Sequence, residues 1–109
     1  MAGAISALTL AELITGAAAT DGGLERLHRQ ELVGATEATF ETLTFDSSCA
    51  HAYRRVYAAV MARGRKPRGS RAIDLMIAAT ALANELPLYT LNAADLRGLE
   101  SLIEIVDLS

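Results

Sequence analysis

The feature that most limits the possible folds is an almost wholly apolar segment at residues 73–84, IDLMIAATALAN. A helix that is apolar on nearly every side is typical of one buried on more than one face. A single acid, Asp74, stands at its head. Burying a charge without a partner costs on the order of several kcal/mol, so the position of this carboxylate needs a physical explanation.

The rest of the chain alternates between strand and helix patterns. Short strands are predicted at residues 4–7, 40–46, 86–92 and 102–108. Helices are predicted from about residue 9, at 24–38, from a cap at Ser47 or Ser48 to about 63, and at 73–84, with a helical turn at 93–98. This order is typical of an α/β layer fold with a mainly parallel sheet. The 109 residues, 51% of them hydrophobic, suit a single domain.

Composition limits the cellular compartment and the kinds of partner that this domain can have. One cysteine, Cys49, excludes an internal disulfide, and a net charge of −3 gives no reason to expect a general binder of polyanions. The sequence shows neither a signal peptide pattern nor an apolar run of about 18 residues. We therefore expect a cytoplasmic protein with no membrane partner.

Acidic and amide side chains follow the predicted strands. Glu12 and Asp74 are expected in the first turns of their helices, and Asn92 follows the third strand, with Asp95 three residues on. Sites in open parallel sheets form beyond the carboxyl ends of the strands, so we expect these oxygens to meet at one edge. Hard oxygen ligands suit Mg²⁺ or Mn²⁺, and a bound water could then serve phosphoryl chemistry.

The same acids can also be explained by a purely structural role, in which they stabilise the starts of their helices. The helix macrodipole favours carboxylates in a first turn, and Thr9 with Glu12 has the form of a capping box. Under this reading neither Glu12 nor Asp74 needs a metal.

Two segments resemble the PIN domain, specifically VapC-type toxins. Residues 5–16, ISALTLAELITG, fit an S-x-x-T-x-x-E-L-x-x-G pattern centred on Glu12. Residues 72–108 fit a D-x-x-I-A-A-x-A helix opening at Asp74 and then a T-x-N-x-x-D stretch with Thr90, Asn92 and Asp95. Leu96 stands where the family usually has Phe.

The resemblance implies a three-layer α/β/α sandwich around a parallel sheet and Mg²⁺- or Mn²⁺-dependent cleavage of RNA, controlled by a VapB-type antitoxin. Glu12 and Asp74 would be metal ligands, completed by Asn92 and Asp95. A basic run either binds RNA phosphates or is a solvated loop; it includes Arg65, Lys66, Arg68 and Arg71. The Ala-rich apolar helices favour a homodimer.

One departure from the family pattern affects the expected activity. The family begins with a strand that ends in a ligand Asp, whereas this sequence passes from Met1 directly into the second-strand motif. We therefore expect a PIN-like domain over residues 1–109 that lacks the first strand and cleaves RNA poorly. A misplaced start, a degenerate relative or a partner that supplies the strand would each explain the absence of the first strand.

The alternative function is an inactive remnant that binds antitoxin or dimerises. A nucleotide-binding domain is disfavoured, because no G-x-G-x-x-G occurs.

Overall fold

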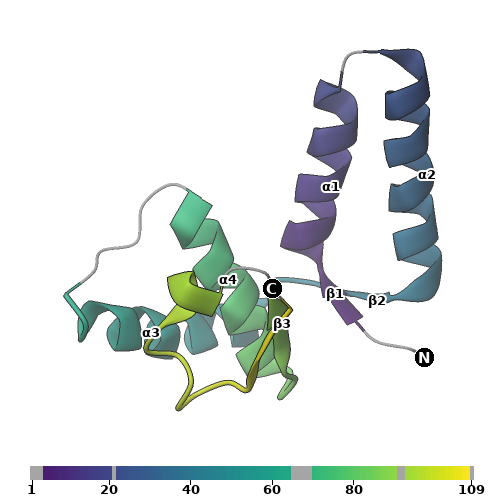
Figure 1. The fold of residues 1–109 in the computed structure, drawn as a ribbon. Coiled ribbons are helices and arrows are strands. Elements are labelled where there is room, and N and C mark those ends of the chain that lie inside the picture. The colour runs from purple at the N-terminus through teal and green to yellow at the C-terminus, as the bar shows by residue number, and fades with distance from the viewer. Residues whose placement is uncertain (1–3, 21, 65–69, 91–92, 109) are drawn as a thin grey trace. The chain divides into compact units, whose positions relative to one another are not determined.

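The computed structural model describes residues 4–20, 22–64, 70–90 and 93–108. Contacts divide the chain into two compact units, Met1–Thr44 and Phe45–Ser109, and each is described by itself. Both units join helices to a pair of parallel strands, so the predicted α/β class with parallel strands is confirmed (Figure 1). Within the described residues, none of the helices has both the length and the apolar character needed to cross a membrane.

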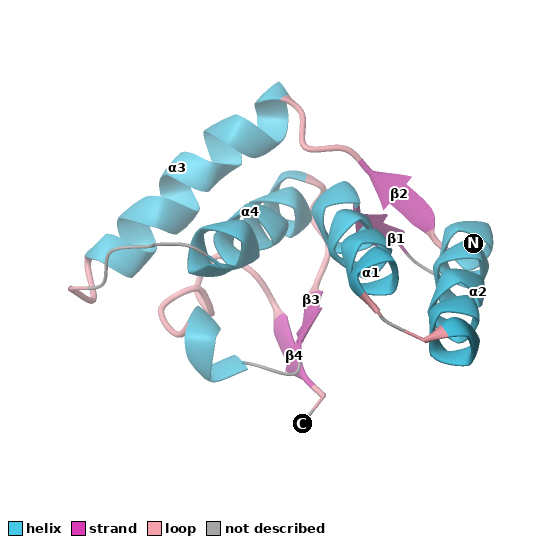
Figure 2. Ribbon diagram, turned by 90° about the horizontal axis from the view of Figure 1, so that it is seen from above, coloured by secondary structure: helices cyan, strands magenta, loops and turns pink. Residues whose placement is uncertain are grey.

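The first unit is a helical hairpin between two paired strands. Its elements are β1 (Ala4–Ser6), α1 (Ala7–Ala19), α2 (Gly23–Thr39) and β2 (Glu41–Leu43). Strands β1 and β2 are parallel, with Ala4 opposite Glu41 and Ser6 opposite Leu43. Parallel neighbours need a long crossover, and here the two helices provide it, lying side by side (Figures 1 and 2).

Helix α1 starts earlier than the sequence pattern suggested. Ser6 is its N-cap: the backbone is extended, and the Ser6 hydroxyl accepts a hydrogen bond from the Leu8 N–H at 3.1 Å. The predicted capping box of Thr9 and Glu12 is therefore wrong, because both residues already lie inside the helix. Ser6, at the end of β1, caps the helix directly, so the helix has already begun at Thr9 and that residue cannot be an N-cap.

The second unit contains the larger core. Its elements are α3 (Ser47–Met61), α4 (Ser70–Ala83), β3 (Leu88–Thr90), the 3₁₀ helix η1 (Ala93–Leu96) and β4 (Ile105–Asp107). Strands β3 and β4 are parallel, with Leu88 opposite Ile105 and Thr90 opposite Asp107. Strand β4 is shorter than the predicted 102–108, because only three of its residues align with β3; the end of the predicted strand 86–92 lies outside the described residues.

Helices α3 and α4 pack against each other and against the segment after η1. The residues with no exposed surface include Val56 on α3, Leu75 and Ala78 on α4, and Leu99 beyond η1. Every residue of 71–83 is buried or half-buried, so the prediction that this helix is covered on more than one side is confirmed. Burial of this kind stabilises a fold by about 25 cal/mol per Å² of apolar surface.

The start of α3 and the end of α4 each depend on one acidic residue. Asp46 caps α3, since its Oδ1 accepts from the Cys49 N–H at 3.1 Å; the predicted caps Ser47 and Ser48 are already helical. At the end of α4, Glu85 adopts a φ of 56°. The Glu85 and Leu86 N–H groups donate to carbonyls of the last helical turn, which closes the helix in a Schellman-type cap.

Candidate metal centre

Asp74 lies on α4 at the margin of the core. The next residue in the chain, Leu75, is fully buried, whereas Asp74 is half-buried. Desolvation raises the pKa of Asp74, the negative charge of Asp95 raises it further, and the Arg71 guanidinium lowers it. The Asp74 carboxyl thus lies within the electrostatic reach of a second acid and a base.

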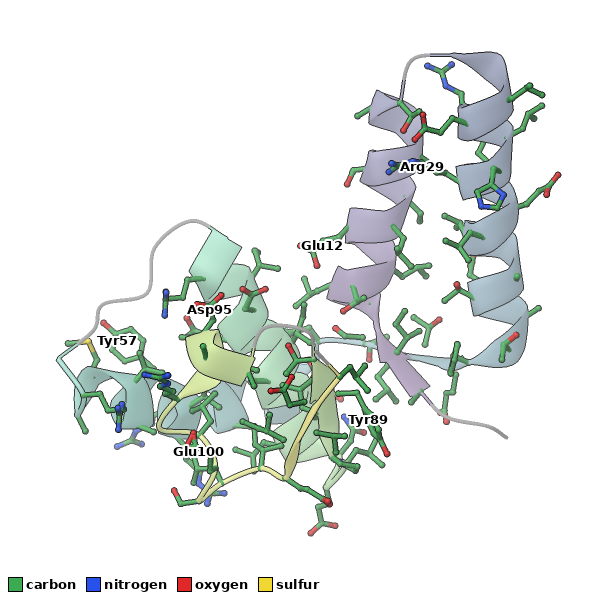
Figure 3. The ribbon with its side chains drawn as sticks, in the orientation of Figure 1. Glu12, Arg29, Tyr57, Tyr89, Asp95 and Glu100 are labelled. Carbon is green, nitrogen blue, oxygen red and sulfur yellow. The ribbon has the colours of Figure 1, made fainter. Side chains whose placement is uncertain are left out.

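The 3₁₀ helix η1 supplies the second acid. Leu96, the last residue of η1, is buried in the core with Leu99 and fixes the position of the segment. The neighbouring side chain, Asp95, therefore stays at the surface, with 50% of it exposed (Figure 3). Asp95 and Asp74 are brought together by the packing of η1 beside α4, across more than twenty residues of sequence.

Arg71 connects the two elements. It lies one helical turn before Asp74 on α4, and its Nη2 is 3.6 Å from the Asp95 Oδ1. Its Nη1 also donates to the backbone carbonyl of Asp95 at 3.5 Å. Both distances are at the long end for such contacts, so the guanidinium is held loosely. Arg71 was predicted as part of a basic linker; the structure places it inside α4, and the R-x-x-D spacing on a helix is the signal that could have shown its role.

Two carboxylates and one guanidinium leave a net negative charge at this place. Hard oxygen donors in such a pair fit a divalent cation, which would remove the repulsion that raises the pKa of Asp74. The described residues contain no group of three or more acids, histidines or cysteines placed to hold a metal. Asp74 and Asp95 could therefore provide two protein ligands, and further ligands would be water or other residues.

The remaining predicted ligands are not brought together with this pair by what the structure describes. Glu12 lies on α1 in the first unit, exposed (Figure 3), and Asn92 lies outside the described residues. The meeting of Glu12 and Asn92 with Asp74 stays a prediction. Neither Glu12 nor Asp74 is in the first turn of its helix, because both helices begin earlier than expected. The macrodipole explanation for these acids loses force, since the effect fades beyond the first turn.

Glu12 has its own surroundings in the first unit. With Leu13 and Gly16 of α1 it lines a pocket of about 320 Å³ between the two helices of the hairpin. Helix α2 contributes Glu25 and Arg29, which form an ion pair at 3.1 Å across one turn. Glu12 thus lines a pocket whose surface is mostly apolar and to which α2 also contributes a charged pair.

The basic run is described only at its two ends. Arg65, Lys66 and Arg68 lie outside the described residues. Arg63, just beyond α3, lies against Gly98 after η1: a Cβ on Gly98 would come 2.5 Å from the Arg63 Cδ. Arg63 and Arg71 therefore both reach the η1 segment that carries Asp95.

Comparison with known proteins identifies related folds. The model of the PIN domain family matches residues 2–101. VapBC-5 of Mycobacterium tuberculosis, a member of the VapBC family of toxin-antitoxin systems, superposes with a TM-score of 0.77 and 29% identity over 96% of this chain and 81% of that chain. DNA-bound VapBC of Salmonella typhimurium gives a TM-score of 0.69 and 31% identity over 94% of this chain and 72% of that one. VapBC-1 of nontypeable Haemophilus influenzae, at 23% identity, shares the fold, with a TM-score of 0.76 and coverage of 95% and 72%. No curated protein sequence matches this chain.

Proposed function

This chain belongs to the PIN domain family, and we propose that it is a metal-dependent endoribonuclease toxin of a VapBC-type toxin-antitoxin pair. The observation that carries the proposal is the Asp74–Asp95 pair, two acids from separate elements held at one place with Arg71 beside them. Similarity to toxins of VapBC systems supports the nuclease class. The acid pair supports the use of a cation.

Mg²⁺ or Mn²⁺ would be held by the carboxylates of Asp74 and Asp95, with Glu12 and Asn92 proposed to complete the set. Such an ion lowers the pKa of bound water and stabilises negative charge on phosphate oxygens. The protein's own part is to hold the acids on rigid elements, α4 and η1, which the core residues Leu75 and Leu96 fix in place. The basic residues of the run named in the sequence would attract the RNA backbone; these are Arg65, Lys66, Arg68 and Arg71.

The test is cleavage of single-stranded RNA by the purified chain with Mg²⁺ or Mn²⁺, compared with Asp74→Asn. The amide keeps the shape of the side chain and removes its charge, so cleavage should fall about 100-fold, which equals about 2.7 kcal/mol of barrier. Glu104→Gln, an acid-to-amide change at an exposed position after the core, should cleave as the unaltered chain does. Equal cleavage by Asp74→Asn and the unaltered chain would contradict the proposal.

The α1–α2 hairpin is proposed as the surface that binds a VapB-type antitoxin. Four large apolar side chains are exposed there, which is more than isolated surface residues require: Ile14, Leu24, Leu27 and Leu32. Changing Leu24 and Leu27 to Gln should weaken binding of a small antitoxin encoded beside this chain, with unfolding unchanged. If the variant still bound the antitoxin, the antitoxin would have to bind a surface other than the hairpin.

This surface also favours the second candidate function, a PIN-like module that binds antitoxin or its own copy without cleaving RNA. For a homodimer, α3 is the other candidate surface, because Tyr57 and Met61 are 37% and 40% exposed. Antitoxin capture with no Mn²⁺-dependent cleavage would favour this function.

A further inference from the structure

We propose that Arg71 is a built-in counter-cation of the Asp74–Asp95 pair, which a divalent metal ion must displace in order to bind. This inference rests on the proposed metal-dependent function, and it concerns what controls the affinity of the same site for the metal ion. Arg71 approaches Asp95 through two atoms, Nη2 at 3.6 Å from Oδ1 and Nη1 at 3.5 Å from the backbone carbonyl. It therefore occupies the side of Asp95 that faces α4, where Asp74 also lies.

The geometry distinguishes this role from that of a structural ion pair. The Arg71 and Asp95 side chains are 30% and 50% exposed, and the contact is long. Exposed pairs of this kind add little to folding stability. A loosely held guanidinium can move away when a stronger cation arrives, because a long flexible stem connects it to the helix.

The positive charge of Arg71 explains why the guanidinium must move before a metal ion binds. Without metal, one positive charge offsets two negative ones, which limits the repulsion between Asp74 and Asp95. With a dication between the carboxylates, the same guanidinium becomes a like charge a few ångströms from the metal. At such separations the repulsion in a water-like medium is enough to weaken binding about 10-fold.

Two opposite effects are thus expected from Arg71→Gln. Mn²⁺ should bind about 10-fold more tightly, since no cation has to leave. The metal-free protein should be somewhat less stable, because the two acids lose their compensating charge. A residue with only a structural role would weaken both properties together.

The experiment is a Mn²⁺ titration of the full chain at pH 7, followed by the electron paramagnetic resonance signal of the free ion, with thermal unfolding measured in parallel without metal. Arg71→Lys keeps the charge and should bind Mn²⁺ within about 3-fold of the unaltered chain. Arg54→Gln removes an exposed positive charge from α3 and should leave the affinity unchanged. Tighter binding by Arg71→Gln alone supports the proposal.

If the unaltered chain binds Mn²⁺ and Arg71→Gln binds equally or more weakly, the inference about Arg71 is wrong and the metal site stands. If neither protein binds Mn²⁺, the metal site is rejected and the inference falls with it. A second measurement needs no variant: saturating Mg²⁺ should shift the Nε–Hε nuclear magnetic resonance signal of Arg71 and leave that of Arg54 in place. An unmoved Arg71 signal would overturn the proposal.

Discussion

The two units use the same kinds of element in different ways. In the second unit, α3 and α4 bury Val56, Leu75 and Ala78 completely. In the first unit, none of the residues of α2 is buried, and Leu24 on that helix is 87% exposed. Both units carry a parallel strand pair, so the difference lies in how the helices are covered.

The side chains of the hairpin explain the contrast. Helix α1 ends in small residues, including Gly16 and Ala17, which offer little surface to the leucines of α2. Helices α3 and α4 instead meet through interdigitating Val, Leu and Ala side chains. The second unit thus has the core needed for its own stability, whereas the first presents apolar surface of the kind that a partner covers.

The largest effect should come from truncating the same residue type in the two units. Leu99→Ala removes a fully buried side chain and should lower the free energy of unfolding by about 2–5 kcal/mol. Leu24→Ala removes an exposed one and should change it by no more than about 0.5 kcal/mol. Urea unfolding followed by circular dichroism measures both. Similar losses would show that the hairpin has a core of its own.

A matched pair of glycines should give effects of opposite sign. Gly34 lies within α2, and an added Cβ there meets nothing within 4 Å, so Gly34→Ala should gain up to about 1 kcal/mol of stability. Gly98 has a φ of +98°, and its added Cβ would meet the Arg63 Cδ at 2.5 Å. Gly98→Ala should therefore cost about 1 kcal/mol or more. A neutral Gly98→Ala would mean that the turn after η1 is less constrained than the core around it.

The end of α4 offers a smaller gain in the well-packed unit. Glu85 has a φ of 56°, a conformation that glycine adopts without strain. Glu85→Gly should raise the free energy of unfolding by about 0.5–1 kcal/mol. Glu85→Ala is the control, because it removes the side chain and keeps the strained conformation; it should give no gain. Equal gains from both would assign the effect to the side chain.

Hydrophobic patterning was enough to predict the order of elements and the buried helix. The run around Leu75 and Ala78 has no polar face, and burial on more than one side follows directly from that pattern. Helix starts were less predictable, because several capping residues compete at each. Ser6 and Asp46 cap their helices in place of Thr9 and Ser47, and the choice depends on which residue still has extended backbone.

The candidate site was predictable in its residue types and less so in its contacts. Asp74 and Asp95 were named because acids were expected after strands and at helix starts, although Asp74 in fact lies beyond the first turn of α4. Arg71 was not assigned to them, because glycine and proline nearby indicated a linker that ends after it, while α4 in fact begins at Ser70. The pair of Arg71 and Asp95 joins residues far apart in sequence, and only packing of η1 beside α4 creates it.

The smallest expected effect concerns pH and separates two acids of the second unit. The pKa of Asp74 is raised, chiefly by desolvation and then by Asp95, so its ionised form destabilises the fold above its folded-state pKa. That penalty disappears as the pH falls below 3.8, the usual value, because the carboxyl is then protonated in both states. The pKa of Asp46 is lowered, chiefly by its hydrogen bond from the Cys49 N–H, so its contribution is present above 3.8 and is lost as the pH falls through the lowered value.

Amide variants turn this difference into a measurement. At pH 7 Asp74→Asn should be more stable than the unaltered chain, by less than about 1 kcal/mol because the group is partly exposed. The gain should shrink toward zero near pH 3. Asp46→Asn should be less stable at pH 7, and its deficit should also shrink in acid. Thermal unfolding without metal from pH 3 to 7 tests both signs. A stability loss in Asp74→Asn at pH 7 would mean that the attraction of Arg71 outweighs desolvation and the charge of Asp95 in the metal-free protein, and would weaken the case that a metal ion is needed there.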